Sequence, residues 1–595
     1  MAGSKGRKQR RADRNLQEGL RLHQSGQLRE AFESYKSVLE DDPKNADALN
    51  LMGVIMQVAG NLEAAITFLE QATQNAPGYF APYVNLGNAL QANGKPAEAV
   101  DAFHTALSLN ADNNHAIHNN LSSALNDLGE YQSALESAEI ALKGMSDKTS
   151  ARLNLGNALL GLERVEEAEV CFREIVRADP AHSNAWFNLG NALMLSPGKV
   201  EDARECFERA VALDEDHAEK HYNLGNTLMK LSLFDEAATS FENTLKLDEA
   251  HVGAMCNLGT ALQSCGKLAQ SIENFRCALL REPESADLHF NMALSLLQNG
   301  DYSEGWKEFE WRWQTPQMCA QKRPTDVPTW LGEEFDGKTL LINAEQGFGD
   351  AIRFSRFASE VKSRGGNVVM ECRSPVSQLL SLVDGIDETF DLGQPLPEHD
   401  LQIDLMSLPY ALGVTLDNLT AQVPYIHLGD QSSAAFEVNP ETKLKIGIVW
   451  SGSTTRDQAH LRDCPPELFE SLAEVPGVQL YSLQVGAEQS LLDSLSTRAA
   501  VIDLTSDLKD FADTAAVVKA LDLVISVDTA VLHLAAALGK PVWGLMSDPT
   551  GYFWMNERSD SPWYPTVKLF RQPTTGDWNP VFDKVREKLL EQVQG

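Results

Sequence analysis

The sequence predicts an array of paired-helix repeats followed by two Rossmann-like α/β domains. Two observations lead to this fold class. Small residues recur at a fixed spacing through the first half, and short apolar runs alternate with helical stretches in the second half. A chain of 595 residues is also too long for one hydrophobic core, so several domains are expected.

The repeat signal is a small residue that returns at a spacing of about 34 residues. Its positions are Gly19, Gly53, Gly87, Ser122, Gly156, Gly190, Gly225, Gly259 and Ala293. A second small residue follows in each repeat, at Ala31, Ala65, Ala99, Ala134, Ala168, Ala203, Ala237, Ser271 and Gly305. This pattern is typical of tetratricopeptide repeats, in which small residues let two antiparallel helices approach closely. About nine repeats are expected to stack into a superhelix with a concave groove.

A column of asparagines occupies one position of the first helix in most repeats. Its members are Asn85, Asn120, Asn154, Asn188, Asn223, Asn257 and Asn291. Because an amide both donates and accepts hydrogen bonds, such a ladder can pair with the backbone of an extended peptide. The protein O-GlcNAc transferases, in which such repeats precede a glycosyltransferase domain, carry a similar ladder. The alternative is that these asparagines cap neighbouring helices or belong to the repeat consensus.

The domain limits follow from where the repeat period starts and stops. We expect a disordered basic tail (1–14), repeats (15–315), a connector (316–335), an N-terminal Rossmann-like half (336–430) and a C-terminal Rossmann-like half (440–595). The array ends in Trp306, Phe309, Trp311 and Trp313, an aromatic cluster that either caps the array or seats the next domain.

Buried strands are predicted in the second half from short apolar runs with helical stretches between them. They are Leu340–Asn343, Val368–Glu371, Leu401–Leu405, Lys445–Trp450, Val478–Leu483, Leu523–Val527 and Val542–Leu545. Strand C-termini and helix N-termini converge in the cleft between two such halves, which is therefore the expected ligand site.

Composition argues against several classes of function. A formal net charge of −34 disfavours nucleic-acid binding, and the eight cysteines form no C-x-x-C pair that would suggest a zinc or redox site. No apolar run is long enough to span a membrane, and the start of the chain lacks the apolar core of a secretory signal. Reduced cysteines and a cytoplasmic location are expected.

The first motif with chemical potential is Glu345-Gln-Gly-Phe-Gly-Asp350, between a predicted strand and a helix. Gly347 and Gly349 permit a tight turn, and Asp350 is expected to open the helix. There the carboxylate serves either as a helix N-terminal residue or as a general base facing the cleft.

The second motif, Trp450 to Arg462, ends a strand with hydroxyl residues followed by cations. Ser451, Thr454 and Thr455 are candidates for binding a phosphate or diphosphate. Arg456, His460 and Arg462 are candidates for neutralising its charge. The alternative is a polar loop. Gln484 closes another predicted strand and is a weaker candidate for contacting a ribose or base.

The third motif places Asp528, Thr529 and Ala530 where a buried strand meets a helix, with His533 one turn further on. A helix N-terminus offers N–H groups and positive potential to an anion. The alternative is that Asp528 or Thr529 caps the helix and His533 is a core histidine.

Together these motifs resemble the heptosyltransferase-like family, which has the GT-B fold. The resemblance covers roughly 336–595 and implies that the C-terminal half (440–595) binds the nucleotide sugar. It implies that Asp350 is the catalytic base, that Thr454 and Thr455 bind phosphate, and that Asp528-Thr529-Ala530 with His533 forms the donor site. The lysine that follows the family's threonines has no clear counterpart, and Arg462 is the candidate substitute. Gln484 and Glu488 are both candidates for the family's acidic ribose contact.

The architecture as a whole resembles bacterial flagellin glycosyltransferases of the FlmG type. This implies an inverting protein O-glycosyltransferase that transfers a nonulosonic acid such as pseudaminic acid to Ser or Thr of a polypeptide, flagellin in that family, held by the repeats. The donor is then a nucleotide sugar, CMP-activated for such a sugar, with no separate cofactor. No metal is expected, since GT-B enzymes commonly need none and 336–595 lacks Asp-x-Asp. The alternatives are a lipid or polysaccharide glycosyltransferase, or a repeat scaffold with a degenerate transferase domain.

Overall fold

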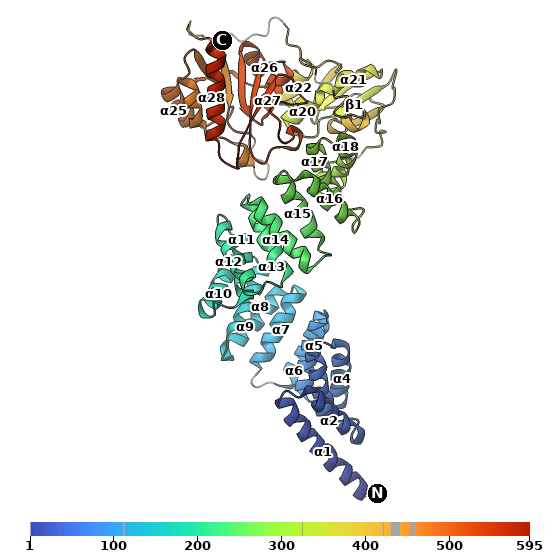
Figure 1. Cartoon of the computed structure of the whole chain (residues 1–595). Helices are drawn as coiled ribbons and strands as arrows, with labels where there is room; N and C mark the ends of the chain where they lie inside the picture. The colour runs from blue at the N-terminus through green and yellow to red at the C-terminus, as the bar shows by residue number, and fades with distance from the viewer. Residues whose placement is uncertain are drawn as a thin grey trace. The chain divides into compact units, whose positions relative to one another are not determined.

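A computed structural model describes residues 2–110, 114–323, 325–419, 422–429, 441–452 and 459–594. The chain divides into two compact units, Met1–Leu231 and Ser232–Gly595. The first unit consists of repeat helices. The second contains the remaining repeats and two α/β halves (Figure 1).

The described repeats are built from helices α1 to α18, taken in consecutive pairs. The first unit contains α1 (Ala2–Gln24), α2 (Leu28–Asp41), α3 (Ala46–Val58), α4 (Leu62–Asn75), α5 (Phe80–Ala92), α6 (Pro96–Leu109), α7 (His115–Leu128), α8 (Tyr131–Gly144), α9 (Thr149–Gly161), α10 (Val165–Ala178), α11 (Ser183–Met194), α12 (Val200–Leu213) and α13 (Ala218–Lys230). The second unit continues with α14 (Phe234–Leu247), α15 (Val252–Ser264), α16 (Leu268–Leu279), α17 (Ala286–Asn299), α18 (Tyr302–Phe309), the 3-10 helix η1 (Glu310–Gln314) and α19 (Pro316–Cys319).

The recurring small residues lie where the two helices of a repeat meet. A Cβ added at Gly87 would lie 2.6 Å from a ring carbon of Phe103, so a larger residue would force the helices apart. Where the repeat has serine instead, the Ser122 hydroxyl donates to the carbonyl of Ala134 at 2.7 Å. These contacts confirm that the small residues allow close helix packing.

The basic N-terminal segment differs from the expected disordered tail, because it forms the first part of α1. Ala12 is 1% exposed and belongs to the same apolar cluster as Tyr35 of α2. Arg11 pairs with Asp41 at the end of α2. Packing against α2 therefore extends the helix through a sequence that composition alone suggests is a solvated tail.

The N-terminal α/β half contains a parallel sheet of strand order β3-β2-β1-β4. Its strands are β1 (Thr339–Asn343), β2 (Asn367–Cys372), β3 (Glu388–Asp391) and β4 (Leu401–Asp404). Its helices are α20 (Phe348–Phe354), η2 (Ser355–Phe357), α21 (Ala358–Ser363), α22 (Ser374–Leu380), η3 (Leu405–Ser407) and α23 (Leu408–Ala411). The strand order reverses between β1 and β4, and ligands of open α/β sheets bind at such a switch point.

The C-terminal α/β half contains a second parallel sheet, of order β10-β9-β8-β5-β6-β7. Its strands are β5 (Leu444–Val449), β6 (Val478–Ser482), β7 (Ile502–Asp503), β8 (Leu523–Val527), β9 (Val542–Met546) and β10 (Val567–Arg571). Its helices are η4 (Ala459–Arg462), η5 (Pro466–Phe469), α24 (Glu470–Ala473), α25 (Gln489–Ala499), η6 (Thr505–Asp507), α26 (Phe511–Ala520), α27 (Ala530–Ala537), η7 (Tyr552–Trp554) and α28 (Asn579–Gln594). This is the dinucleotide-fold order, with its switch point between β5 and β8.

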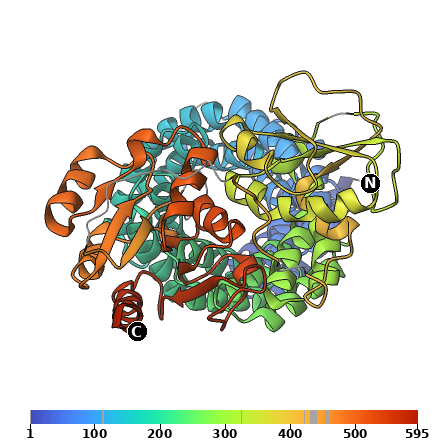
Figure 2. The same ribbon diagram turned by 90° about the horizontal axis from the view of Figure 1, so that it is seen from above.

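The predicted fold class is confirmed by these elements. The predicted strands are all present, each within one residue of its expected ends, and β3, β7 and β10 are additional. The two halves lie side by side in both views of the ribbon, one yellow and the other orange to red (Figure 2). Helices α20 and α27 contact each other across this boundary.

The last repeat shares a hydrophobic core with both α/β halves. The Trp306 ring of α18 meets Phe354 of α20 edge to face at 5.9 Å and Trp563 at 6.4 Å. The indole N–H of Trp563 donates to the hydroxyl of Tyr302 at 2.8 Å. Of the two roles predicted for the aromatic cluster, seating the next domain is therefore the one seen for Trp306. Within the described residues, no helix has both the length and the apolar character needed to cross a bilayer.

Candidate active site

The turn after β1 carries Asp350 to the boundary between the two halves. The sequence suggested that Asp350 opens the helix. Helix α20 instead begins at Phe348, so Asp350 is the third residue of its first turn. Its carboxylate accepts a hydrogen bond from Nη2 of Arg353 at 2.9 Å. The Asp350 side chain is 14% exposed and that of Arg353 is fully buried.

Arg353 lies among aromatic rings as well as beside Asp350. Its guanidinium carbon is 3.6 Å from the centre of the Phe553 ring and 4.5 Å from that of Phe354. Its Nε and Nη1 are buried without a hydrogen-bond partner in the described structure. Asp350 therefore lies next to a buried cation, and Arg353 becomes a candidate functional residue that sequence reasoning missed. The sequence signal that could have identified Arg353 is its place three residues after Asp350 on the same short helix, a spacing that allows an ion pair.

The turn that carries Asp350 packs directly against the segment from Asp528 to His533. A Cβ added at Gly349 would lie 3.1 Å from Cδ2 of His533 and 3.6 Å from Cα of Ala530. Glycine at this position thus lets the start of α20 approach the start of α27. The structure brings together Asp350 and the Asp528–His533 segment, which are far apart in the sequence.

Thr529 caps helix α27. Its side chain accepts from the backbone N–H of Leu532 at 3.4 Å, and its hydroxyl lies 2.9 Å from that of Ser526. The first N–H groups of α27 have no partner within the helix, as at every helix start. Helix α27 begins directly after β8, one of the two strands that flank the switch point. The capping role predicted for Thr529 is present, and its donor-binding role stays a prediction.

His533 is held on both ring nitrogens and is almost fully buried. Its Nδ1 lies 3.2 Å from the Tyr564 hydroxyl and its Nε2 lies 3.6 Å from Oδ1 of Asp528. The ring stacks on Trp554 with a centroid distance of 5.5 Å. Burial lowers the pKa of His533, and the charge of Arg353 acts in the same direction while Asp528 opposes it. A neutral ring is then expected at neutral pH, which favours its interpretation as a core histidine that orients Asp528.

The end of β5 lies next to α27, as the switch point requires. A Cβ added at Gly452 would lie 3.7 Å from Nη2 of Arg462 and 3.8 Å from both the Asp528 carbonyl and Cγ2 of Thr529. Arg462 is therefore close enough to the start of α27 to share an anion with it. Thr454, Thr455 and Arg456 lie outside the described residues.

Gln484 has a backbone role that the sequence did not predict. Its Oε1 accepts from the N–H groups of Trp450 at 3.1 Å and of Ser451 at 3.0 Å, and so ties the end of β5 to the loop after β6. Glu488 precedes α25 and is exposed. Neither residue is shown as a ribose contact. Among the described residues, no group of three or more His, Cys, Asp or Glu side chains could hold a metal ion.

Several members of the asparagine column are hydrogen-bonded between neighbouring repeats. Asn120, Asn188 and Asn223 each donate to an asparagine Oδ1 one repeat earlier, at 2.9, 2.7 and 3.0 Å. Asn85 bonds Asn50 at 2.8 Å in the same way. These contacts use one donor of each amide, so they support a structural role and leave further donor capacity for a peptide.

The remaining members of the column make different contacts. Asn154 is buried and donates to the backbone of Asn119 at 3.0 Å, and Asn291 contacts Sγ of Cys256 at 3.5 Å. Asn257 also has an interaction partner. The peptide-binding interpretation of the column stays a prediction.

Family models match two parts of the chain. Tetratricopeptide repeat models match residues 22–90, 84–148, 153–218, 195–252 and 256–309. The model described as glycosyltransferase family 9 (heptosyltransferase) matches residues 489–575, which contain Asp528, Thr529 and His533 but not Asp350. The chain therefore carries tetratricopeptide repeats and a glycosyltransferase family 9 domain.

Similar proteins cover the chain only in part. Protein FlbA of Caulobacter vibrioides is 25% identical over 350 residues, which are 53% of this chain and 57% of FlbA. The Hsp70-Hsp90 organising protein of Plasmodium falciparum is 35% identical over 95 residues, 16% of this chain and 37% of that protein. The chain thus spans well under two thirds of either relative. A solved tetratricopeptide repeat protein from Parabacteroides merdae is 17% identical, with a TM-score of 0.37, and covers 42% of this chain and 99% of its own.

Proposed function

We propose that this chain is a glycosyltransferase that moves a sugar from a nucleotide sugar to a hydroxyl group of a polypeptide. The observation that carries the proposal is the packing of the Gly349–Asp350 turn against the start of α27. A carboxylate and a helix N-terminus with a nearby arginine then face one boundary between two Rossmann-like halves. Transfer from a nucleotide sugar requires a base for the acceptor and a positive site for the leaving phosphate.

In the proposed reaction, Asp350 takes the proton of the acceptor hydroxyl as its oxygen attacks the anomeric carbon. The bond from that carbon to the phosphate oxygen breaks, and the nucleotide leaves with the electron pair. Attack opposite the leaving group inverts the anomeric centre. The N–H groups at the start of α27 and the guanidinium of Arg462 stabilise the negative charge on the phosphate. The proton on Asp350 then passes to solvent.

The nucleotide belongs in the C-terminal half. The ends of β5 and β8 meet at its switch point, where Ser451, Arg462, Asp528 and Thr529 gather. The glycosyltransferase family 9 match falls on the same half. The resemblance to flagellin glycosyltransferases favours a CMP-activated nonulosonic acid as donor, with no metal or cofactor, in the cytoplasm.

In this proposal the repeats bind the acceptor polypeptide, and flagellin is the proposed acceptor. The asparagine column supports this because Asn120, Asn188 and Asn223 each keep hydrogen-bonding capacity after donating to an asparagine of the preceding repeat. In the full-length chain, replacing the five asparagines of the first unit by alanine should weaken flagellin binding by about 0.5–1.5 kcal/mol per lost hydrogen bond. Asn61→Ala, which removes a helix cap outside the column, is the matched control. Equal affinity of the two variants and wild type would exclude the column from acceptor binding.

Donor use tests the proposal as a whole. Wild-type chain is incubated with flagellin and CMP-, UDP-, GDP- or ADP-sugars, with and without EDTA, and the released nucleotide is measured by chromatography. We expect release from one donor class, dependent on flagellin and insensitive to EDTA. Release that needs a lipid or polysaccharide in place of a polypeptide would assign a different acceptor.

A non-catalytic scaffold is the alternative that one observation favours. Asp350 forms an ion pair with the buried Arg353, which by itself gives the carboxylate a structural role. A scaffold would release no nucleotide from any donor and would bind flagellin with unchanged affinity.

A further inference from the structure

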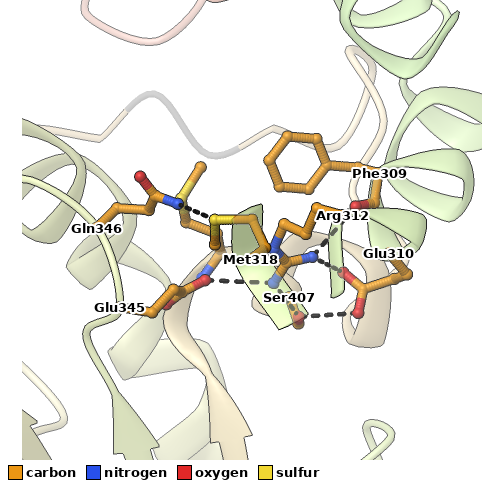
Figure 3. Close-up of polar contacts among 8 residues, drawn as sticks. Phe309, Glu310, Arg312, Met318, Glu345, Gln346 and Ser407 are labelled. Carbon is orange, nitrogen blue, oxygen red and sulfur yellow. Dashed lines mark hydrogen bonds and ion pairs between the residues drawn. The ribbon is translucent and has the colours of Figure 1, made fainter. Parts of the chain in front are cut away.

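The final segment of the repeat array reaches the switch point of the N-terminal sheet. In a Rossmann-like sheet this is where a ligand is expected, at the ends of the strands on either side of the order reversal. Here Glu345 follows β1 and Ser407 follows β4, and both bond the same side chain, Arg312 of η1 (Figure 3). A side chain from the repeats thus occupies the position of a small-molecule contact.

Arg312 bridges three segments of the chain. Its Nη2 donates to Ser407 Oγ at 2.7 Å and to Glu345 Oε1 at 3.2 Å, and its Nη1 donates to Glu310 Oε1 at 2.6 Å. The Ser407 hydroxyl in turn donates to Glu310 Oε2 at 2.9 Å. The Arg312 side chain is 1% exposed, and its guanidinium also lies 4.9 Å from the Trp313 ring. These contacts fix its guanidinium in one orientation.

The residues held in this way begin the turn that ends at Asp350. Glu345 is its first residue, and Gln346 contacts Sδ of Met318 from α19 at 3.7 Å. At the far end of α20, Phe354 packs against Trp306. The array and the segment that follows it therefore contact both ends of the stretch that carries the proposed base.

We propose that Arg312 is a positioning residue supplied by the repeat array, which holds the turn from Glu345 to Asp350 in its working geometry. The expected effect of Arg312 on the rate of sugar transfer rests on the proposed function. Its expected effect on the order of the turn does not, because that effect is structural. This positioning role implies that the repeats do more than hold the acceptor, because they complete the catalytic turn.

Charge supports this assignment. Burial raises the pKa of Glu345 to about 7, and the positive charge of Arg312 opposes that rise while the negative charge of Asp404 adds to it. The negative charge of Glu310 also acts on Arg312 and raises its pKa. The positive charge of Lys322 lowers the pKa of Asp404. Protonation of Glu345 weakens its contact with Arg312, so a loosened turn and slower transfer are expected as the pH falls through about 7. Glu345→Gln should remove that limb of the kcat profile.

The test replaces Arg312 by methionine in the full-length chain, with Arg281→Met, an exposed arginine of an earlier repeat, as the control. Hydrogen exchange of peptides covering 345–354 reports the turn, and single-turnover transfer reports its function. We expect faster exchange there and a single-turnover transfer rate lower by about 10–100-fold, with donor affinity within about twofold of wild type. Arg312→Lys keeps the charge but lacks the planar fork, so it should restore only part of the rate.

Unchanged exchange in 345–354, with the control behaving identically, overturns the inference. Faster exchange with a wild type that transfers no sugar supports the positioning role and overturns the proposed function instead. If Arg312→Met does not fold, Ser407→Ala removes one of the guanidinium contacts and leaves the charge in place. It should speed exchange in the same peptides, and normal exchange in that variant contradicts the proposal.

Discussion

Replacement of Asp350 by asparagine separates a catalytic carboxylate from a structural one. The change removes the negative charge that pairs with Arg353, a cation whose side chain is fully buried. Breaking a buried ion pair by removing one partner costs about 3–5 kcal/mol. Because Asp350 keeps 14% exposure, the lower end of that range is expected.

A second variant restores the charge balance without restoring the base. Combining Asp350→Asn with Arg353→Met leaves no unpaired charge, since neutral replacements of buried pairs are often tolerated. Its free energy of unfolding should recover most of the loss. It should remain about 0.5–2 kcal/mol below that of wild type, because the double variant loses the cation–π contact between Arg353 and Phe553. Transfer should stay slower than in Arg353→Met by about 10²–10⁴-fold, the usual contribution of a general base.

Urea unfolding followed by tryptophan fluorescence gives the stability of each variant, and single-turnover transfer gives the rate. Stability of Asp350→Asn equal to that of wild type would refute the ion-pair argument. A double variant that regains both stability and transfer would refute Asp350 as the base, because the only lasting effect of the single change would then be structural.

Three further predictions concern other parts of the second unit. Asp528→Ala and Thr529→Ala should each weaken nucleotide-sugar binding while flagellin binding is unchanged, and calorimetry showing unaltered donor affinity would reduce both residues to structural roles. Trp306→Ala should destabilise the chain by about 3–5 kcal/mol, as measured by urea unfolding, because it opens a cavity between the last repeat and both halves. Burial lowers the pKa of His533 in the folded chain, so the unfolded chain binds a proton on this ring more readily. The free energy of unfolding should therefore decrease as the pH is lowered below about 6.5. His533→Asn should show a smaller loss between pH 7.5 and 5.5, and an identical loss would mean that another group is responsible.

The repeats and strands were predictable because their signals are local. The small residues that recur along the array mark helix contacts inside one repeat, such as that of Gly87 with Phe103. The central parallel strands β8 and β9 are buried along their whole length and read as nearly continuous apolar runs. β7 is two residues long and β3 is polar at its ends, so neither stands out in the sequence.

The candidate residues of the site could be predicted one by one, but their arrangement in space could not. The sequence indicates that Asp350 and Asp528 each lie near a strand end, but their approach depends on how α20 packs on α27. Arg353 and Arg312 were missed because charged residues on short helices are usually exposed. Their burial depends on Phe553, Glu345 and other partners distant in the chain.

The intact mass of flagellin tests the central claim most directly. Flagellin is incubated with the donor sugar nucleotide and either wild-type chain or the variant that combines Asp350→Asn with Arg353→Met. The account predicts a mass increase equal to whole sugar residues with wild type, and little or none with the variant over the same time. Flagellin of unchanged mass after incubation with wild type and every donor class would contradict it.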